Sequence, residues 1–180
     1  MMRETARPLA IANRQRRARP RRGDILLLVD RILTSEGEDG GLEIALVGEG
    51  TIRALHRDWL DDDTVTDVIS FPHGKPLPGP DAAAVPIGSV AVCVAVCERS
   101  AEALHVPLHD EIARMLIHGA LHVLGYDHDT APKRNRMRAR ERRYLAWYRR
   151  TRLEVVEPPA RCARAGLSRA KARRGSRSSQ

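Results

Sequence analysis

The chain has 180 residues, a formal net charge of +8, and a composition that is 42% apolar but only 3% aromatic. This length is typical of one domain with tails, and the scarcity of aromatic side chains means that Leu, Ile, Val and Ala must build the core. No stretch of about 18 consecutive apolar residues occurs, so we expect no membrane-spanning helix. We also expect no secretory signal, because no apolar stretch precedes Ile25.

The positive charge is concentrated at the two ends of the chain. Residues 1–22 carry eight Lys and Arg against one acidic residue, and residues 151–180 carry eight against two. Residues 23–150 carry fifteen against twenty and are therefore net acidic. We predict a folded domain at 23–150 between two disordered basic tails, 1–22 and 151–180. Such tails are either solvated and without function, or they attract RNA phosphates without reading sequence.

Apolar periodicity and breaks rich in Gly and Pro predict that helices and strands interleave between residues 23 and 150. The stretch from Pro72 to Pro86, rich in Pro, Gly and Ala, is predicted to be a loop that covers a cleft as a flap. Pro107 is expected to open a helix, and Thr130 is expected to cap the last one. In chain order, the predicted elements are a helix at 24–33, a strand at 42–47, a helix at 51–60, strands at 65–71 and 87–92, and helices at 94–104, 107–124 and 130–149.

One of these helices is apolar nearly all round. Residues 112–124 read IARMLIHGALHVL, in which Arg114 is the only polar residue besides two histidines. A helix of this kind is buried. Strands and helices that interleave around such a helix indicate an α+β fold, a single compact domain with a small mixed β-sheet packed against helices.

Three histidines lie at the end of this helix, in the run HGALHVLGYDH at 118–128. His118 and His122 are one helical turn apart and share a face. Gly125 lets the chain leave the helix, and the turn that follows can bring His128 back toward that face. This is how a protein builds a three-histidine site for one zinc ion.

The histidines have two explanations. In the first, two core imidazoles bond to backbone carbonyls while the third lies in a loop. In the second, a zinc ion satisfies all three at once. An unpaired buried polar group costs roughly 1–3 kcal/mol, so two such groups one turn apart favour zinc. We therefore predict a central buried zinc-binding helix and one Zn²⁺ ion held by His118, His122 and His128.

Three protein ligands leave one coordination position for water, which is the arrangement of catalytic rather than structural zinc. Zinc can lower the pKa of that water to about 7. The spacing also overlaps the metzincin protease pattern H-E-x-x-H-x-x-G-x-x-H. Gly119 occupies the position of the glutamate base, and glycine cannot transfer a proton, so peptide hydrolysis is disfavoured. Asp127 is expected only to shape the turn. No general base or other catalytic residue can be named from the sequence.

The run at 118–128 resembles the signature H-G-x-L-H-L-x-G-Y-D-H of the YbeY family, the bacterial endoribonucleases and rRNA maturation factors. Residues 66–72, TDVISFP, are similar to the family segment T-D-V-L-S-F-P, and PIGSV at 86–90 stands where the family reads L-G-D-I. Met137 and Glu141 match a methionine and a glutamate of the family's last helix. The resemblance covers residues 24–150. It implies a zinc-dependent, single-strand-specific endoribonuclease in small-subunit ribosomal RNA maturation and ribosome quality control, with the small ribosomal subunit as a partner.

Two departures from the family pattern are present. The places of a family asparagine and an aromatic–arginine pair hold His56, Trp59 and Leu60, and the aspartate of L-G-D-I is Ser89. Leu60 cannot replace an arginine that holds RNA, and Arg57 is the nearest candidate to do so. We expect zinc binding to survive both changes, and the resemblance implies that they bear on catalytic rate and RNA handling. The alternative function is therefore a non-catalytic, zinc-containing ribosome-assembly or RNA-binding factor.

Asp67 and the last helix each have two interpretations. Asp67 either orients a zinc-binding imidazole or caps a strand end. Residues 133–150 carry nine Lys and Arg and one acidic residue, and this basic face is either solvated or a rail for the RNA backbone beside the zinc. The inward stripe of this helix is predicted to consist of Met137, Tyr144, Leu145 and Tyr148.

Cys93, Cys97 and Cys162 are odd in number and lack the paired spacing of zinc ligands. We interpret Cys93 and Cys97, in the apolar run AVCVAVC, as small buried hydrophobes. Unpaired cysteines fit a reducing, cytoplasmic location. The Arg-rich N-terminus leaves an organelle transit peptide as the alternative.

Overall fold

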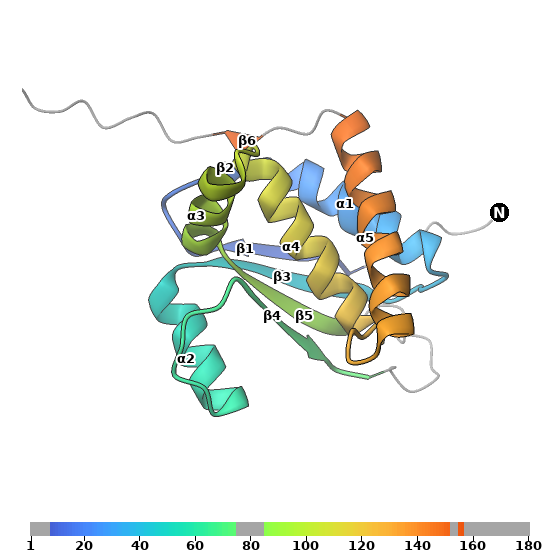
Figure 1. Ribbon diagram of the computed structural model, residues 1–180, viewed down its shortest axis with the longest axis horizontal. Coiled ribbons are helices and arrows are strands. Elements are labelled where there is room, and N and C mark those ends of the chain that lie inside the picture. The colour runs from blue at the N-terminus through green and yellow to red at the C-terminus, as the bar shows by residue number, and fades with distance from the viewer. Residues whose placement is uncertain (1–7, 75–84, 152–154, 157–180) are drawn as a thin grey trace, which may run out of the picture.

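The computed structural model describes residues 8–74, 85–151 and 155–156. Its strands are β1 (Ala10–Asn13), β2 (Arg19–Pro20), β3 (Gly41–Val47), β4 (Val68–Pro72), β5 (Pro86–Cys93) and β6 (Val155–Val156). Four of them form a central mixed sheet in the order β1-β3-β5-β4 (Figure 1). In this sheet β1, β3 and β5 are parallel, and β4 runs antiparallel to β5. β2 and β6 form a separate antiparallel pair.

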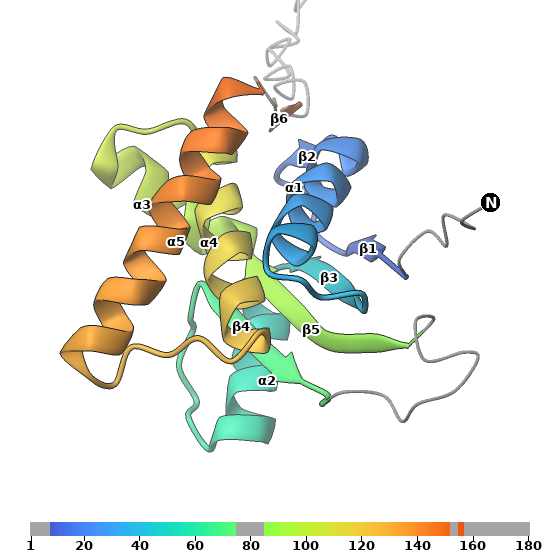
Figure 2. The same ribbon diagram turned by 90° about the vertical axis from the view of Figure 1, so that its right-hand side faces the viewer.

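Helices cover both faces of the sheet. They are α1 (Arg22–Ser35), α2 (Glu49–Leu60), α3 (Val94–Leu104), α4 (Leu108–Val123) and α5 (Ala131–Arg150). α4 lies against β4 and β5, with α1 and α3 beside it and α5 packed on its outer side (Figure 2). α2 packs against the other face of β4 and β5. This architecture confirms the predicted α+β fold with a mixed sheet packed against helices.

Strand residues alternate between two hydrophobic cores, one on each face of the sheet. Leu42 and Leu46 of β3 belong with Val92 of β5 to the larger core beneath α1 and α4. The neighbouring positions, such as Ala91, belong to the smaller core with Ile52 of α2. Burial on both faces explains why β5 reads as a nearly continuous apolar run.

α4 is the buried central helix that the run at 112–124 predicts, with ten of its 16 residues buried. Two of the buried residues are acids in its first turn. Asp110 accepts a hydrogen bond from Nε of Arg149 in α5 at 2.6 Å, and Glu111 pairs with Arg114 at 2.5 Å. The arginines offset the cost of burying these charges, and the acids suit the positive end of the helix.

The other predicted elements also match, with small differences at their ends. The five expected helices correspond to α1 to α5 within a few residues, and the Thr130 side chain caps α5 by accepting from the backbone N–H of Lys133. The strand expected from Val65 begins only at Val68. Most of the loop expected at 72–86, and with it the flap, lies outside the described residues. No helix within the described ranges is long and apolar enough to cross a membrane.

The folded part begins earlier than the boundary expected at residue 23. β1 is an edge strand of the sheet, and β2 pairs with β6, which falls within the expected C-terminal tail. The sequence AIAN of β1 is short and weakly patterned, and its stability comes from pairing with β3 rather than from its own amphipathicity. Residues 1–7 and 157–180, the remaining parts of the two expected tails, lie outside the described residues.

Gly119 allows α4 to lie directly on the sheet. A Cβ atom at this position would lie 2.5 Å from Cγ1 of Val90 and 3.0 Å from Oγ of Ser70. The residue that stands at the metzincin glutamate position therefore faces β4 and β5, where a glutamate has no room. This explains physically why the helix carries glycine beside its first histidine.

Replacing Gly119 by Ala should destabilise the protein by about 1–3 kcal/mol, the usual cost of overpacking a core. Gly50→Ala in α2 is the matched control, because a Cβ there meets nothing within 4 Å. The control should be neutral or stabilising by up to about 1 kcal/mol, since Ala favours helix more than Gly does. Urea unfolding with a chelator present measures both, and equal effects would contradict the close packing at Gly119.

Candidate metal centre

The three histidines meet at the C-terminal end of α4. The Nε2 atoms of His118 and His122 lie 3.1 Å apart. One ring nitrogen from each of the three residues lies within 4.8 Å of the other two. The ring of His128 is stacked on that of His118 at 5.8 Å between centroids and lies edge-on to that of His122 at 5.1 Å. The rings therefore converge on one point, as the spacing predicts.

A glycine-dependent helix ending returns the chain toward α4. Gly125 has a φ of +83°, in the left-handed region that glycine adopts without strain. Its N–H donates to the carbonyl of His122 at 3.0 Å, and the N–H of Tyr126 donates to the carbonyl of Leu121 at 2.9 Å. This pair of bonds is the Schellman motif. The motif ends α4 at Val123, one residue after His122, and turns the chain so that His128 lies beside the other two rings.

Asp127 shapes this turn, as expected. Its Oδ1 accepts the backbone N–H of His128 at 2.7 Å, and its Oδ2 pairs with Nζ of Lys133 at 3.6 Å. The hydrogen bond from His128 lowers the pKa of Asp127, and Lys133 acts in the same direction. The carboxylate is therefore charged at neutral pH and holds the backbone of the turn.

Glu141 of α5 fixes the position of the proton on His118. Its Oε1 accepts a hydrogen bond from Nδ1 of His118 at 2.7 Å. This bond holds the pKa of Glu141 below its usual value, although burial acts to raise it. An ionised carboxylate only accepts, so the proton lies on Nδ1 and the Nε2 lone pair of His118 points toward the other rings.

His122 is held in its neutral form. Burial lowers the pKa of its imidazole, and the nearby rings of His118 and His128 lower it further. A neutral imidazole with an exposed lone pair is the form that coordinates a metal ion. The cluster can therefore hold a metal through three nitrogen atoms.

A groove of about 300 Å³ opens beside the cluster, between α4 and α5. Arg134 and Arg138 lie one turn apart on α5, at its edge. Arg134 donates to the carbonyl of His128 at 3.3 Å. Within the described part of the chain, Arg138 makes no hydrogen bond or ion pair. The residues that line the groove are Arg114, His118, His128, Arg134, Met137, Arg138 and Glu141.

Ser89, one of the two departures from the family pattern, does not face this groove. Its hydroxyl donates to Oε2 of Glu43 at 3.2 Å and lies 3.0 Å from Nε2 of His73. Its neighbour Val90 belongs to the core beneath α4, so the side chain of Ser89 lies on the opposite face of the sheet. Ser89 lines a second hollow on that face with Phe71 and other residues of the sheet.

The other departure lies at the end of α2. Trp59 and Leu60 are 69% and 57% exposed, and the Trp59 ring packs edge-on against Phe71 at 5.6 Å. Arg57, the candidate replacement for the missing arginine, pairs with Asp58 at 2.9 Å. Its guanidinium thus lies beside acids at the end of α2, whereas the arginines that line the groove come from α4 and α5.

Asp67 has the contacts of a strand-end cap. Its Oδ1 accepts the N–H of Val68 at 2.8 Å and the hydroxyl of Thr66 at 3.3 Å. The carboxylate that bonds to a histidine is instead Glu141. One signal for it was available in the sequence, since Glu141 is the only acid of residues 133–150 and follows the inward-facing Met137 by one turn.

The remaining sequence interpretations of side-chain burial are confirmed. Met137, Tyr144 and Tyr148 are buried, and Leu145 packs against the same core. Cys93 and Cys97 are buried and unpaired with each other, and burial raises the pKa of both thiols. Thiols of this kind are unreactive. Cys162 lies outside the described residues.

This fold and this site together define a small α+β protein with three histidines at the end of its central helix. The chain belongs to the endoribonuclease YbeY family, whose model matches residues 10–149. The match begins at the first residue of β1, in agreement with the early start of the folded part.

Several curated relatives carry the name Endoribonuclease YbeY. The protein from Halorhodospira halophila is 42% identical over 118 residues, which cover 66% of this chain and 77% of the relative. The protein from Alcanivorax borkumensis is 41% identical over 97 residues, which cover 53% and 55%. A solution structure from Thermotoga maritima has a similar fold, with a TM-score of 0.54 and 24% identity over 85% of this chain and 99% of that one.

The contact between Glu141 and His118 predicts a single tautomer for that ring. In the metal-free protein with a neutral His118 ring, the proton of that ring should lie on Nδ1, and Glu141→Ala should produce a mixture of tautomers. Long-range ¹H–¹⁵N correlation spectra of the imidazoles measure this directly. Unchanged His118 signals in the variant would show that Glu141 does not set the tautomer, and the exposed His105 provides a ring that should not change.

Proposed function

We propose that this chain is a zinc-dependent, single-strand-specific endoribonuclease that acts in ribosomal RNA maturation on the small subunit and in ribosome quality control in the cytoplasm. The observation that carries the proposal is the convergence of His118, His122 and His128 beside an arginine-lined groove, in a chain of an endoribonuclease family. We further propose that residues 10–150 form the catalytic domain and that the basic segments outside them bind RNA.

The three nitrogen ligands fit one zinc ion. Two nitrogens bound to a tetrahedral zinc at about 2.0–2.1 Å lie about 3.3 Å apart, and the Nε2 atoms of His118 and His122 are 3.1 Å apart. A bound Zn²⁺ supplies Lewis acidity toward a phosphoryl oxygen and lowers the pKa of a water molecule to about 7. His128 is exposed, which leaves solvent and substrate a way to the site. Histidine ligands also suit nickel, copper and iron, so metal analysis is part of the test.

Within residues 23–150, charge favours the groove over the remaining surface as the place where an RNA backbone binds. Residues 23–132 carry six Lys and Arg against nineteen acidic residues, whereas α5 carries nine basic residues and one acid. An acidic body repels RNA, and a basic helix beside the histidines attracts it to that edge. We therefore favour the interpretation of α5 as a rail for the RNA backbone, with Arg138 as a phosphate contact next to the cleavage site.

His122→Ala should remove both the metal and the cleavage of single-stranded RNA, because a site with two of its three ligands binds zinc poorly. His105→Asn is the control, since His105 is exposed, lies outside the cluster and has a φ of 52° that Asn tolerates. Metal analysis and digestion of a labelled single-stranded RNA, each with and without chelator, measure the effect.

The results of this experiment separate the two candidate functions. Full cleavage by a zinc-free His122→Ala protein would eliminate the metal-dependent mechanism. A wild-type protein that holds one metal ion but does not cut RNA would instead favour the non-catalytic assembly factor. In that case the protein should still associate with small-subunit particles.

Arg138→Gln should weaken the binding of single-stranded RNA by the metal-free protein and reduce the slope of log K against log salt by about 0.7, the value for one phosphate contact. Arg150→Gln is the matched control, because it removes the same charge at the far end of α5. Fluorescence anisotropy at several salt concentrations gives both slopes. Equal losses in the two variants would show that α5 acts only through its total charge.

A further inference from the structure

Glu36, at the C-terminal end of α1, joins three elements of the fold. Its side chain is only 9% exposed. The hydroxyl of Tyr126, in the turn after α4, donates to Oε2 at 2.6 Å, and the hydroxyl of Tyr144 in α5 donates to Oε1. Nε of Arg140 lies 3.5 Å from Oε1. One carboxylate therefore bonds to the ligand turn and, through its other oxygen, to α5.

The charge state of this group is settled by its partners. Burial acts to raise the pKa of Glu36, but the hydrogen bonds from Tyr126 and Tyr144 and the charge of Arg140 outweigh it and lower the pKa. Burial together with the same contact raises the pKa of Tyr144 to about 12. The carboxylate is thus an acceptor only, and both hydroxyls must donate to it.

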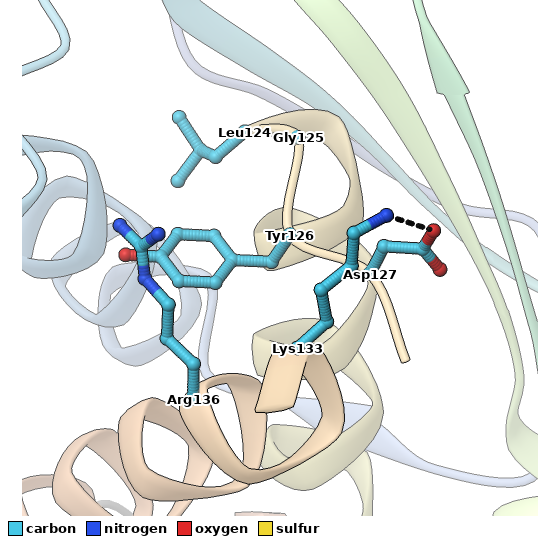
Figure 3. Close-up of a pocket in the computed structure, with 6 residues that line it drawn as sticks. All are labelled: Leu124, Gly125, Tyr126, Asp127, Lys133 and Arg136. Atoms are coloured by element: carbon cyan, nitrogen blue, oxygen red, sulfur yellow. Dashed lines mark ion pairs between the residues drawn. The ribbon is translucent and has the colours of Figure 1, made fainter. Parts of the chain in front are cut away.

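Tyr126 lies in the short stretch of chain between His122, the second ligand on α4, and His128, the ligand in the turn. It directly follows Gly125, which lies two residues beyond the end of α4, and it precedes His128 by two residues. From the α5 side, Arg136 stacks over the Tyr126 ring at 5.2 Å and Lys133 pairs with Asp127 (Figure 3). Lys133 is about half exposed and therefore screened by solvent, whereas the bond to Glu36 is shielded.

We propose that Glu36 is a positioning residue for the metal centre: through Tyr126 it fixes the turn that presents His128 to His118 and His122. His118 and His122 are placed by α4 itself, but His128 depends on a turn that contains a flexible glycine. Because the turn is already fixed, the protein does not lose the conformational entropy of ordering His128 when the metal binds. The inference rests on the metal binding proposed above and adds the residue that preorganises it.

The two tyrosines offer a matched test, because each donates one hydrogen bond to the same carboxylate and only Tyr126 lies in the ligand turn. Tyr126→Phe should weaken Zn²⁺ binding by about 10- to 100-fold, the usual effect of losing a group that supports a ligand. Tyr144→Phe should change it by less than about threefold. Glu36→Gln, which removes the charge from the acceptor, should weaken Zn²⁺ binding about as much as Tyr126→Phe does. Competition with a chromophoric chelator measures the affinities.

A second readout needs no metal. In the metal-free protein, amide hydrogen exchange at Tyr126 and His128 should be at least about tenfold faster in Tyr126→Phe than in Tyr144→Phe, while urea midpoints fall by similar amounts in both. Equal zinc affinities and equal exchange rates for the two variants would overturn the inference, since Glu36 would then serve general stability alone. A wild-type protein that binds no Zn²⁺ would contradict the proposed function instead, and the exchange rates would still decide whether Glu36 fixes the turn.

Discussion

The direct contact of α4 with β4 and β5 is the constraint on which the candidate site depends. Because Gly119 has no side chain, the helix lies on the sheet with a fixed rotation about its axis. Successive residues of a helix point about 100° apart, so His118, one position earlier, points to the side of α4 where it meets Glu141 of α5. His122 follows one turn later on the same side. The core packing and the metal centre thus lie on different faces of one helix, and the rotation that Gly119 permits also sets the direction of the histidines.

Much of this arrangement is present in local sequence signals. The apolar run around two histidines, the glycine after them and the capping threonine of α5 each predict structure within a few residues of themselves, and each prediction is confirmed. The face of the sheet on which Ser89 lies, the strand β1 and the pairing of Arg57 on α2 could not be predicted. The first two depend on partners distant in the sequence, β3 for the strand and Glu43 for the serine. Arg57 has its acids close by in the sequence, but which of them it contacts depends on how the chain turns at the end of α2.

The same limit applies to the carboxylates of the site. Asp67 belongs to the TDVISFP segment, and the sequence offers it as a residue to orient a histidine. Its short side chain instead accepts a hydrogen bond from the backbone N–H of Val68. Glu141 of α5 and Glu36 at the end of α1 meet the histidine region only through tertiary packing. Both acids bond to groups in or next to the histidine motif, so the sequence shows the ligands clearly and hides the residues that hold them in place.

The pairing of β2 with β6 has a consequence for how α5 is held in place. β6 follows the end of α5 within a few residues, and Arg149 ties that end to Asp110 at the start of α4. Asp110 precedes His122 by twelve residues, which is about 18 Å along a helix axis. The β2–β6 pair and the Arg149–Asp110 contact therefore anchor the C-terminal end of α5 at the end of α4 that lies farthest from the imidazoles. Nearer the histidines, α5 is held by the bond from His118 to Glu141, so this helix is fastened toward both ends of α4.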